Sequence, residues 1–237
     1  MQLVDRFAVS DNLYSIVVAG NMNPAIHHPR WYKDVGILDE KEVKEAEEPP
    51  PARSDTPDAV DITGGPLVVS TYAAQFTTRA IRIVCAPQSW SVLTEDENKL
   101  DKCLSVASQI FQKLDSTPVS AYGFNFNHHR QTNMPSVSHH LAELARSQPL
   151  GLTDLFGLPK SARIFYSASI DGRESNTTIE PSFKDPSKVF IGMNFNHPVQ
   201  QTQGFFDLDL MLKRDYPRAH DLSGRFLESI LEALNRK

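Results

Sequence analysis

A six-residue motif occurs twice in the chain and limits what the chain can fold into. Residues 123–128 read Gly-Phe-Asn-Phe-Asn-His and residues 192–197 read Gly-Met-Asn-Phe-Asn-His, so the two copies differ at a single position. Apolar and β-branched residues, which favour strands, precede both copies at 119–122 and at 189–191. The sequence therefore predicts two β-strands of closely similar design.

The alternation of side chains in a strand divides each copy of the motif into an apolar face and a polar face. The apolar faces belong against a hydrophobic core, and they carry Tyr122, Phe124, Phe126, Ile191, Met193 and Phe195. The opposite faces carry residues that are depleted in strands, because glycine has no side chain to pack and asparagine competes for backbone hydrogen bonds. These residues are Gly123, Asn125, Asn127, Gly192, Asn194 and Asn196.

Two strands that both accept these unfavourable residues suggest a shared structural demand. One interpretation is an internal duplication, in which the two strands lie side by side and asparagine amides bond across the pair. A second interpretation is a polar face that contacts a ligand. An ordinary polar sheet face, with a coincidental likeness between the two strings, explains the same residues.

Composition narrows the class of protein. The chain has 237 residues, of which 40% are hydrophobic and 22% are charged, as in ordinary globular proteins. Its net charge is −5 and its basic residues are scattered, so a nucleic-acid partner is not expected. The longest apolar runs, such as residues 16–19, are too short to cross a membrane.

The two cysteines and residues 1–6 indicate the cellular compartment in which the protein is expected. Cys85 falls in a strand pattern and Cys103 on the apolar face of a helix, which favours two buried free thiols in a reducing environment. Residues 1–6 lack the charged and then apolar layout of a signal peptide. We therefore expect a cytoplasmic protein.

Further strands and helices follow from periodicity and end signals. Besides the motif strands, strands are expected at about 13–19, 67–76, 79–85, 89–94, 161–170, 173–180 and 205–212. A long helix is expected over about 95–115, where Thr94 and Glu97 form a capping box. Shorter helices are expected at about 40–48 and 134–147, and Pro217 opens a final helix that runs to about 235.

This order predicts an α+β fold with a mainly antiparallel sheet and the two long helices packed on one face. Residues 1–237 are expected to form a single domain that contains two related halves, at about 67–130 and 134–237. Residues 47–66 contain five prolines and little that could pack, so they are expected to be an extended loop.

Histidines and aspartates supply the few candidates for chemistry. His128 and His197 hold the same place in the two motifs, and with His27 they would gather metal ligands if the motif ends lie together. Asp207 and Asp209 share a face of the strand predicted at 205–212 and could bind magnesium. Strand-end turns and a solvated strand face are the simpler explanations.

Signatures of known catalytic sites are missing from the sequence: it has no phosphate-binding glycine loop and no nucleophile elbow. A non-enzymatic interaction or assembly module without a cofactor, which binds a protein partner or a second copy of itself, is the first hypothesis. A metal-dependent hydrolase or nuclease that uses His128, His197 and the Asp207/Asp209 strand is the second. A small-ligand binder that uses the Asn and Gly faces is the third.

Overall fold

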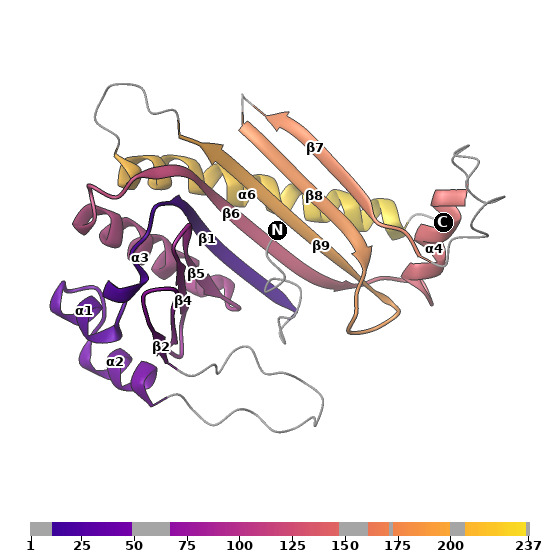
Figure 1. The fold of residues 1–237 in the computed structure, drawn as a ribbon. Helices are drawn as coiled ribbons and strands as arrows, with labels where there is room; N and C mark the ends of the chain where they lie inside the picture. Colours follow the sequence, from indigo (N-terminus) through magenta and orange to yellow (C-terminus); the bar gives the residue numbers. More distant parts are fainter. Residues whose placement is uncertain (1–10, 49–66, 147–160, 171–172, 200–206, 236–237) are drawn as a thin grey trace.

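The computed structural model describes residues 11–48, 67–146, 161–170, 173–199 and 207–235. In this part of the chain, nine strands form one antiparallel sheet in the order β2-β3-β4-β5-β1-β6-β9-β8-β7. Two of the helices, α3 and α6, lie behind this sheet in the view of Figure 1. The predicted α+β class with an antiparallel sheet is confirmed.

Most of the elements before the first motif are shorter than those after it. The strands are β1 (Asn12–Gly20), β2 (Val68–Val69), β3 (Ala74–Thr77), β4 (Arg82–Ala86), β5 (Ser89–Thr94), β6 (Val119–Gln131), β7 (Ile164–Ile170), β8 (Arg173–Pro181) and β9 (Lys188–Pro198). The α-helices are α1 (Pro29–Asp34), α2 (Glu40–Glu47), α3 (Leu100–Lys113), α4 (Val137–Arg146) and α6 (Leu208–Asn235). Within the described residues, none of the helices is both long and apolar enough to cross a membrane.

One hydrophobic core lies between the sheet and its helices, and we call this side of the sheet the helix face. The central strands β1, β6 and β9 supply it with alternate residues, which are fully or almost fully buried: Tyr14, Ile16, Val18, Phe124, Phe126, Ile191, Met193 and Phe195. The intervening residues of the same strands point to the opposite side, which we call the open face. The period of two therefore separates the two faces as the sequence predicts.

Helix α3 packs against β1 and β5 and begins later than its sequence suggests. Residues Leu100, Cys103, Ala107, Ile110 and Phe111 of the predicted apolar stripe are buried. The predicted capping box is wrong, because Thr94 ends β5 and donates its hydroxyl hydrogen to the carbonyl of Ala80. Asp96 instead caps a single 3-10 turn, Glu97–Lys99, that leads into the helix.

Helix α6 replaces both the strand predicted at 205–212 and the helix start predicted at Pro217. It runs unbroken over Leu208–Asn235 with Pro217 inside it. The alternation of apolar residues misled the prediction, because Leu208 and Leu212 are also four residues apart and are both buried as helix positions. Most of the Pro-rich stretch at 47–66 and the Asp171-Gly172 turn lie outside the described residues.

Candidate functional site

The two motif strands, β6 and β9, lie side by side near the middle of the sheet (Figure 1). They run antiparallel, and their register sets Asn125 directly opposite Asn194. Gly123 then lies opposite Asn196, and Gly192 lies opposite Asn127. The two copies of the motif are thus related by a local two-fold axis that passes between the central asparagines.

A row of polar side chains crosses four strands on the open face at this level. In register, Asn176 of β8 is opposite Asn194, and Ser15 of β1 is opposite Asn125. Asn194 donates from Nδ2 to Oδ1 of Asn125 over 2.6 Å, and Asn125 donates from Nδ2 to Oγ of Ser15 over 2.9 Å. We call Asn176, Asn194, Asn125 and Ser15 the amide ladder. These two hydrogen bonds set which end of the Asn125 amide faces each neighbour.

The glycines of the motif make room for this arrangement. A methyl group on Gly192 would lie 3.0 Å from Oδ1 of Asn127 and equally close to the ring of Phe190. On Gly123 it would lie 2.9 Å from the backbone oxygen of Phe195. Both distances are shorter than ordinary contacts, which explains why strand positions that usually disfavour glycine carry it here.

The amide ladder lines a hollow of about 410 Å³ on the open face. Its walls come from β1, β4, β5, β6, β7, β8 and β9, so strands from both ends of the chain contribute to it. All six motif residues predicted as ligand contacts line it: Gly123, Asn125, Asn127, Gly192, Asn194 and Asn196. The structure thus brings together the set of residues that the sequence singled out.

The described residues that line the hollow are uncharged. They are Ser, Thr, Asn, Gly and apolar types, together with Tyr122, and none of them is Asp, Glu, Lys, Arg or His. Apolar surface comes from Val17, Val84 and Leu93 on one side and from Phe165 on the other. Because amides and hydroxyls both donate and accept, the hollow can bond to a partner molecule without selecting a charge.

The proposed metal ligands do not come together. Because β6 and β9 are antiparallel, His128 pairs in register with Ile191 while His197 pairs with Tyr122, so the two histidines lie at opposite ends of the strand pair. His27 bonds through Nδ1 to the hydroxyl of Tyr32 over 2.7 Å, under the other half of the sheet. Among the described residues, no group of three or more His, Cys, Asp or Glu side chains is placed to hold a metal ion.

Each of these histidines has a structural setting instead. The Nδ1 of His128 lies 3.0 Å from Oδ1 of Asn12 and 3.0 Å from a guanidinium nitrogen of Arg130. Burial, with a smaller contribution from Arg130, lowers the pKa of His128 to about 3. Burial also lowers the pKa of His27 to about 4. Both side chains are therefore neutral at pH 7.

His197 belongs to a buried polar cluster on the helix face. Its ring stacks on that of Tyr122 with centroids 4.8 Å apart, and its Nδ1 lies 3.5 Å from Asp215 of α6. The Tyr122 hydroxyl donates to Asp215 over 2.5 Å, and Arg214 donates to both oxygens of the same carboxylate over 2.8 and 2.9 Å. The adjoining cavity of about 20 Å³ has room for little more than one water molecule. The cluster therefore fastens α6 to β6 and β9.

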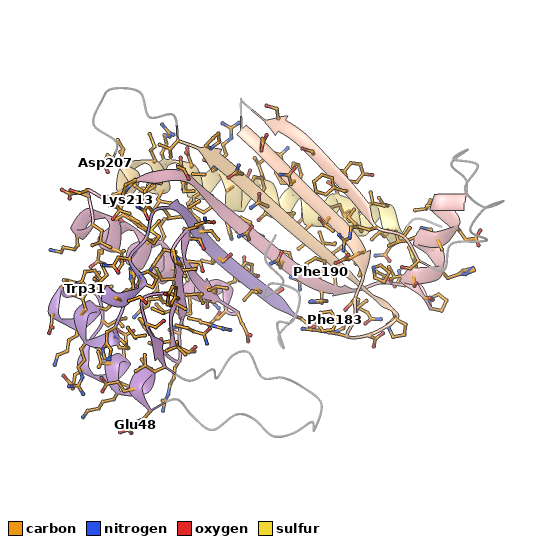
Figure 2. The ribbon with its side chains drawn as sticks, viewed as in Figure 1. Trp31, Glu48, Phe183, Phe190, Asp207 and Lys213 are labelled. Carbon is orange, nitrogen blue, oxygen red and sulfur yellow. The ribbon has the colours of Figure 1, made fainter. Side chains whose placement is uncertain are left out.

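Asp207 and Asp209 stand at the start of α6, so they share no strand face. Asp207 accepts a hydrogen bond from the backbone nitrogen of Leu210 over 3.0 Å, as a capping residue does. Asp209 accepts from Ser108 and from Gln112 of α3 and is bridged by Lys213. Figure 2 shows Asp207 and Lys213 well apart from Phe190, which pairs with His129, the neighbour of His128.

Sequence reasoning missed the part of the site outside the motif. Ser15 lies within an apolar strand and is buried, and Asn176 and Thr178 come from β8. A serine in an apolar run was the available signal for Ser15, since buried hydroxyls need partners.

No protein-family model matches the chain, and no curated protein is significantly similar to it in sequence.

Proposed function

We propose that the protein binds a small uncharged ligand in the hollow of the open face. The observation that carries this proposal is that the amide ladder lines a hollow of about 410 Å³, in which none of the lining residues that the structure describes is charged. Ligand sites in proteins are typically concave, roughly 300–1,000 Å³, and mostly apolar with a few converging polar groups. The hollow has each of these properties.

The lining also indicates the class of ligand. Asn176, Asn194 and Asn196 carry amide groups that both donate and accept hydrogen bonds. Phe165 and Val17 offer apolar surface at the sides of the hollow. A ligand that suits both features has hydroxyl, amide or carbonyl groups beside an apolar face and has no net charge. Neutral sugars, nucleosides and small amides meet this description.

A screen with a blocked variant tests the proposal. Ala121 lines the hollow from β6 without belonging to the amide ladder, so Ala121→Trp should fill the hollow and leave the ladder intact. Neutral sugars, nucleosides and small amides are tested for binding to both proteins by saturation-transfer NMR. We expect compounds that bind the wild-type protein and lose binding to Ala121→Trp.

The matched control is Asn21→Ala, which removes an exposed asparagine that does not line the hollow. This variant should bind as the wild-type protein does. Equal binding to Ala121→Trp, or no binding by any member of the panel, would contradict the proposal. Thermal unfolding of each variant shows whether a loss of binding reflects a loss of the fold.

The two other functional hypotheses have less support. A metal-dependent hydrolase would need His128, His197, Asp207 and Asp209 close together. His128 and His197 lie at opposite ends of the β6–β9 pair, and the two aspartates lie at the start of α6. An interaction or assembly module does not require the hollow. Its best support is a different part of the sheet, the exposed edge strand β7.

We also propose that the chain is built from two related halves, with bounds other than 67–130 and 134–237. In 12–113, the strand β1, short helices and the two-residue strand β2 precede β3, β4, β5 and the helix α3. In 119–235, a strand and a short helix precede β7, β8, β9 and the helix α6. From the β1–β6 junction outward, the sheet order in both halves is first strand, last strand, then two others in reverse, and the first half adds the short strand β2 at its outer edge.

This division makes β1 the counterpart of β6, and β5 the counterpart of β9. The two motif copies then lie in neighbouring strands of the same half, so they mark a local two-fold contact and not the duplication. Coexpression of residues 1–115 and 116–237 as separate chains tests the division. We expect the two to associate into a folded complex, whereas a cut at residue 132, the predicted boundary, should give unfolded or insoluble chains.

A further inference from the structure

The two ends of the sheet are finished differently. At one end β2 is only two residues long, and a very short edge strand offers little backbone to a foreign strand. At the other end β7 is seven residues long and reads Ile-Phe-Tyr-Ser-Ala-Ser-Ile, without a charge or a proline. Long uncharged edge strands are the usual place where another strand adds to a sheet.

The side chains of β7 are open to solvent. Phe165 is 61% exposed and Tyr166 is 58% exposed, and Ser167, Ala168 and Ser169 are also exposed. In the order of the described strands, β7 is paired with β8 alone. The strand thus combines unpaired backbone with two exposed aromatic rings, a combination that globular proteins normally avoid.

We propose that β7 pairs with β7 of a second copy of this chain, antiparallel and centred on Ser167. In this register Tyr166 lies opposite Ala168 of the partner copy, and Phe165 lies opposite Ser169. Each large ring therefore meets a small residue across the two-fold axis, on both faces of the sheet. A register centred on Tyr166 would instead set two tyrosine rings directly opposite each other.

The absence of charged residues in β7 also favours pairing with a second copy of this chain. A strand without charged residues can pair with its own copy without like-charge repulsion. Arg163, just before the strand, is paired with Glu180 of the same chain over 2.6 Å, so its charge is already balanced. The two aromatic rings precede Ser167 and small residues follow it, so the strand is complementary to a second copy of itself in this register. The resulting contact is isologous, as in most homodimers.

The two-fold axis would be perpendicular to the sheet, because each residue pairs with one on the same face. The two sheets then become one continuous sheet with both open faces on the same side. Phe165 belongs to β7 and also lines the hollow. The two hollows would therefore flank the junction between the copies.

Site-specific cross-linking tests the register. Both native cysteines are buried, so Ser167→Cys adds the single exposed thiol among the described residues. Across the proposed pair the two Cα atoms at position 167 are about 4.5–5.5 Å apart, within the roughly 4.4–6.8 Å that a disulfide spans. Mild oxidation should convert Ser167→Cys to a covalent dimer. Ser169→Cys, on the same strand, should cross-link far less, because its two copies are about 13 Å apart in this register.

Two further measurements complete the test. Sedimentation equilibrium of the wild-type protein should show a concentration-dependent dimer, and Tyr166→Lys should shift it to monomer while its circular dichroism spectrum shows that the fold is retained. Tyr72→Lys, an exposed tyrosine beside the β2 edge, is the matched control and should remain dimeric. A wild-type monomer throughout the concentration range, or equal cross-linking at 167 and 169, would overturn the proposal. A monomer would leave a strand from another protein as the occupant of this edge.

Discussion

The two faces of β1, β6 and β9 are made by alternate residues of the same strands and have opposite character. On the helix face, Phe126 packs edge-on against Tyr14 and Phe195 in a core closed by α3 and α6. On the open face, Ser15 and Asn125 belong to a hydrogen-bonded polar row beside a hollow. Neighbouring residues in one strand thus differ completely in what surrounds them.

The contrast shows how a strand can carry residues that weaken strands. Burial of the aromatic face contributes about 1.5–3 kcal/mol for each large side chain. Glycine and asparagine cost the strand a fraction of that amount, since the whole propensity scale spans roughly 1 kcal/mol. The helix face can therefore hold β6 and β9 together while the open face keeps a polar, recessed surface. Under the proposed function, the helix face provides stability and the open face provides the binding surface.

The largest expected effect is the difference in stability loss between truncating a residue on the helix face and truncating one on the open face. Phe126→Ala should lower the free energy of unfolding by roughly 3–5 kcal/mol, because it leaves a cavity beside Tyr14 and Phe195. Urea denaturation measures this value. Asn125→Ala, one residue away on the open face, should lose about 1 kcal/mol. Similar losses from the two variants would remove the distinction between the faces.

A second, smaller effect is the response to pH. Burial holds the pKa of His27 near 4 and that of His128 near 3 in the folded protein, below the roughly 6.5 of an unfolded chain. Below pH 6.5 the unfolded chain binds more protons, so stability present above pH 6.5 is lost as the pH falls toward the folded pKa values. Each histidine should cost on the order of 1–2 kcal/mol between pH 6.5 and 5.

The pH dependence of stability and that of ligand binding should differ, because they depend on different faces of the sheet. The double variant His27→Gln/His128→Gln should have a flatter profile of unfolding free energy against pH than the wild-type protein. Ligand binding in the hollow should change little between pH 5 and 8, because the lining residues within the described part of the chain include no acid, histidine or lysine. A binding constant that follows the stability profile would mean that the ligand contacts a different, titrating part of the molecule.

The smallest effect concerns the amide ladder itself. Asn125 and Asn194 are joined by a 2.6 Å hydrogen bond, so Asn125→Ala and Asn194→Ala should not be additive in stability. We expect a coupling energy of about 0.5–1 kcal/mol from a double-mutant cycle. Asn125→Ala combined with Asn21→Ala serves as the additive control. Additive losses in the first pair would show that the bond contributes nothing in solution.

Local patterns in the sequence identified the strand faces and the motif residues of the site. The alternation in Tyr122, Phe124 and Phe126 fixed which residues enter the core, because a strand has only two faces. The asparagine and glycine positions stood out because they oppose strand propensity. In the structure these residues line the same hollow.

The remaining features depend on partners that are distant in sequence. Ser15 and Asn176 join the site only because β1 and β8 flank the motif strands, and no local pattern encodes that neighbourhood. His128 and His197 do not come together because their strands are antiparallel, and a shared motif does not reveal the relative direction of two strands. The residues that begin α6 alternate like a strand, and burial against α3 decides the outcome.

Side-chain amide NMR tests the central claim most directly, because it observes the ladder residues themselves. The Asn125 and Asn194 side-chain amide signals are assigned by their loss in the corresponding Ala variants, and the strongest compound from the neutral panel is then titrated in. Both signals should shift in proportion to occupancy. The indole signal of Trp90, which is buried on the helix face and donates to Tyr32, should stay in place. A bound compound that moves Trp90 and leaves both asparagine amides unchanged would contradict the assignment of recognition to the open face.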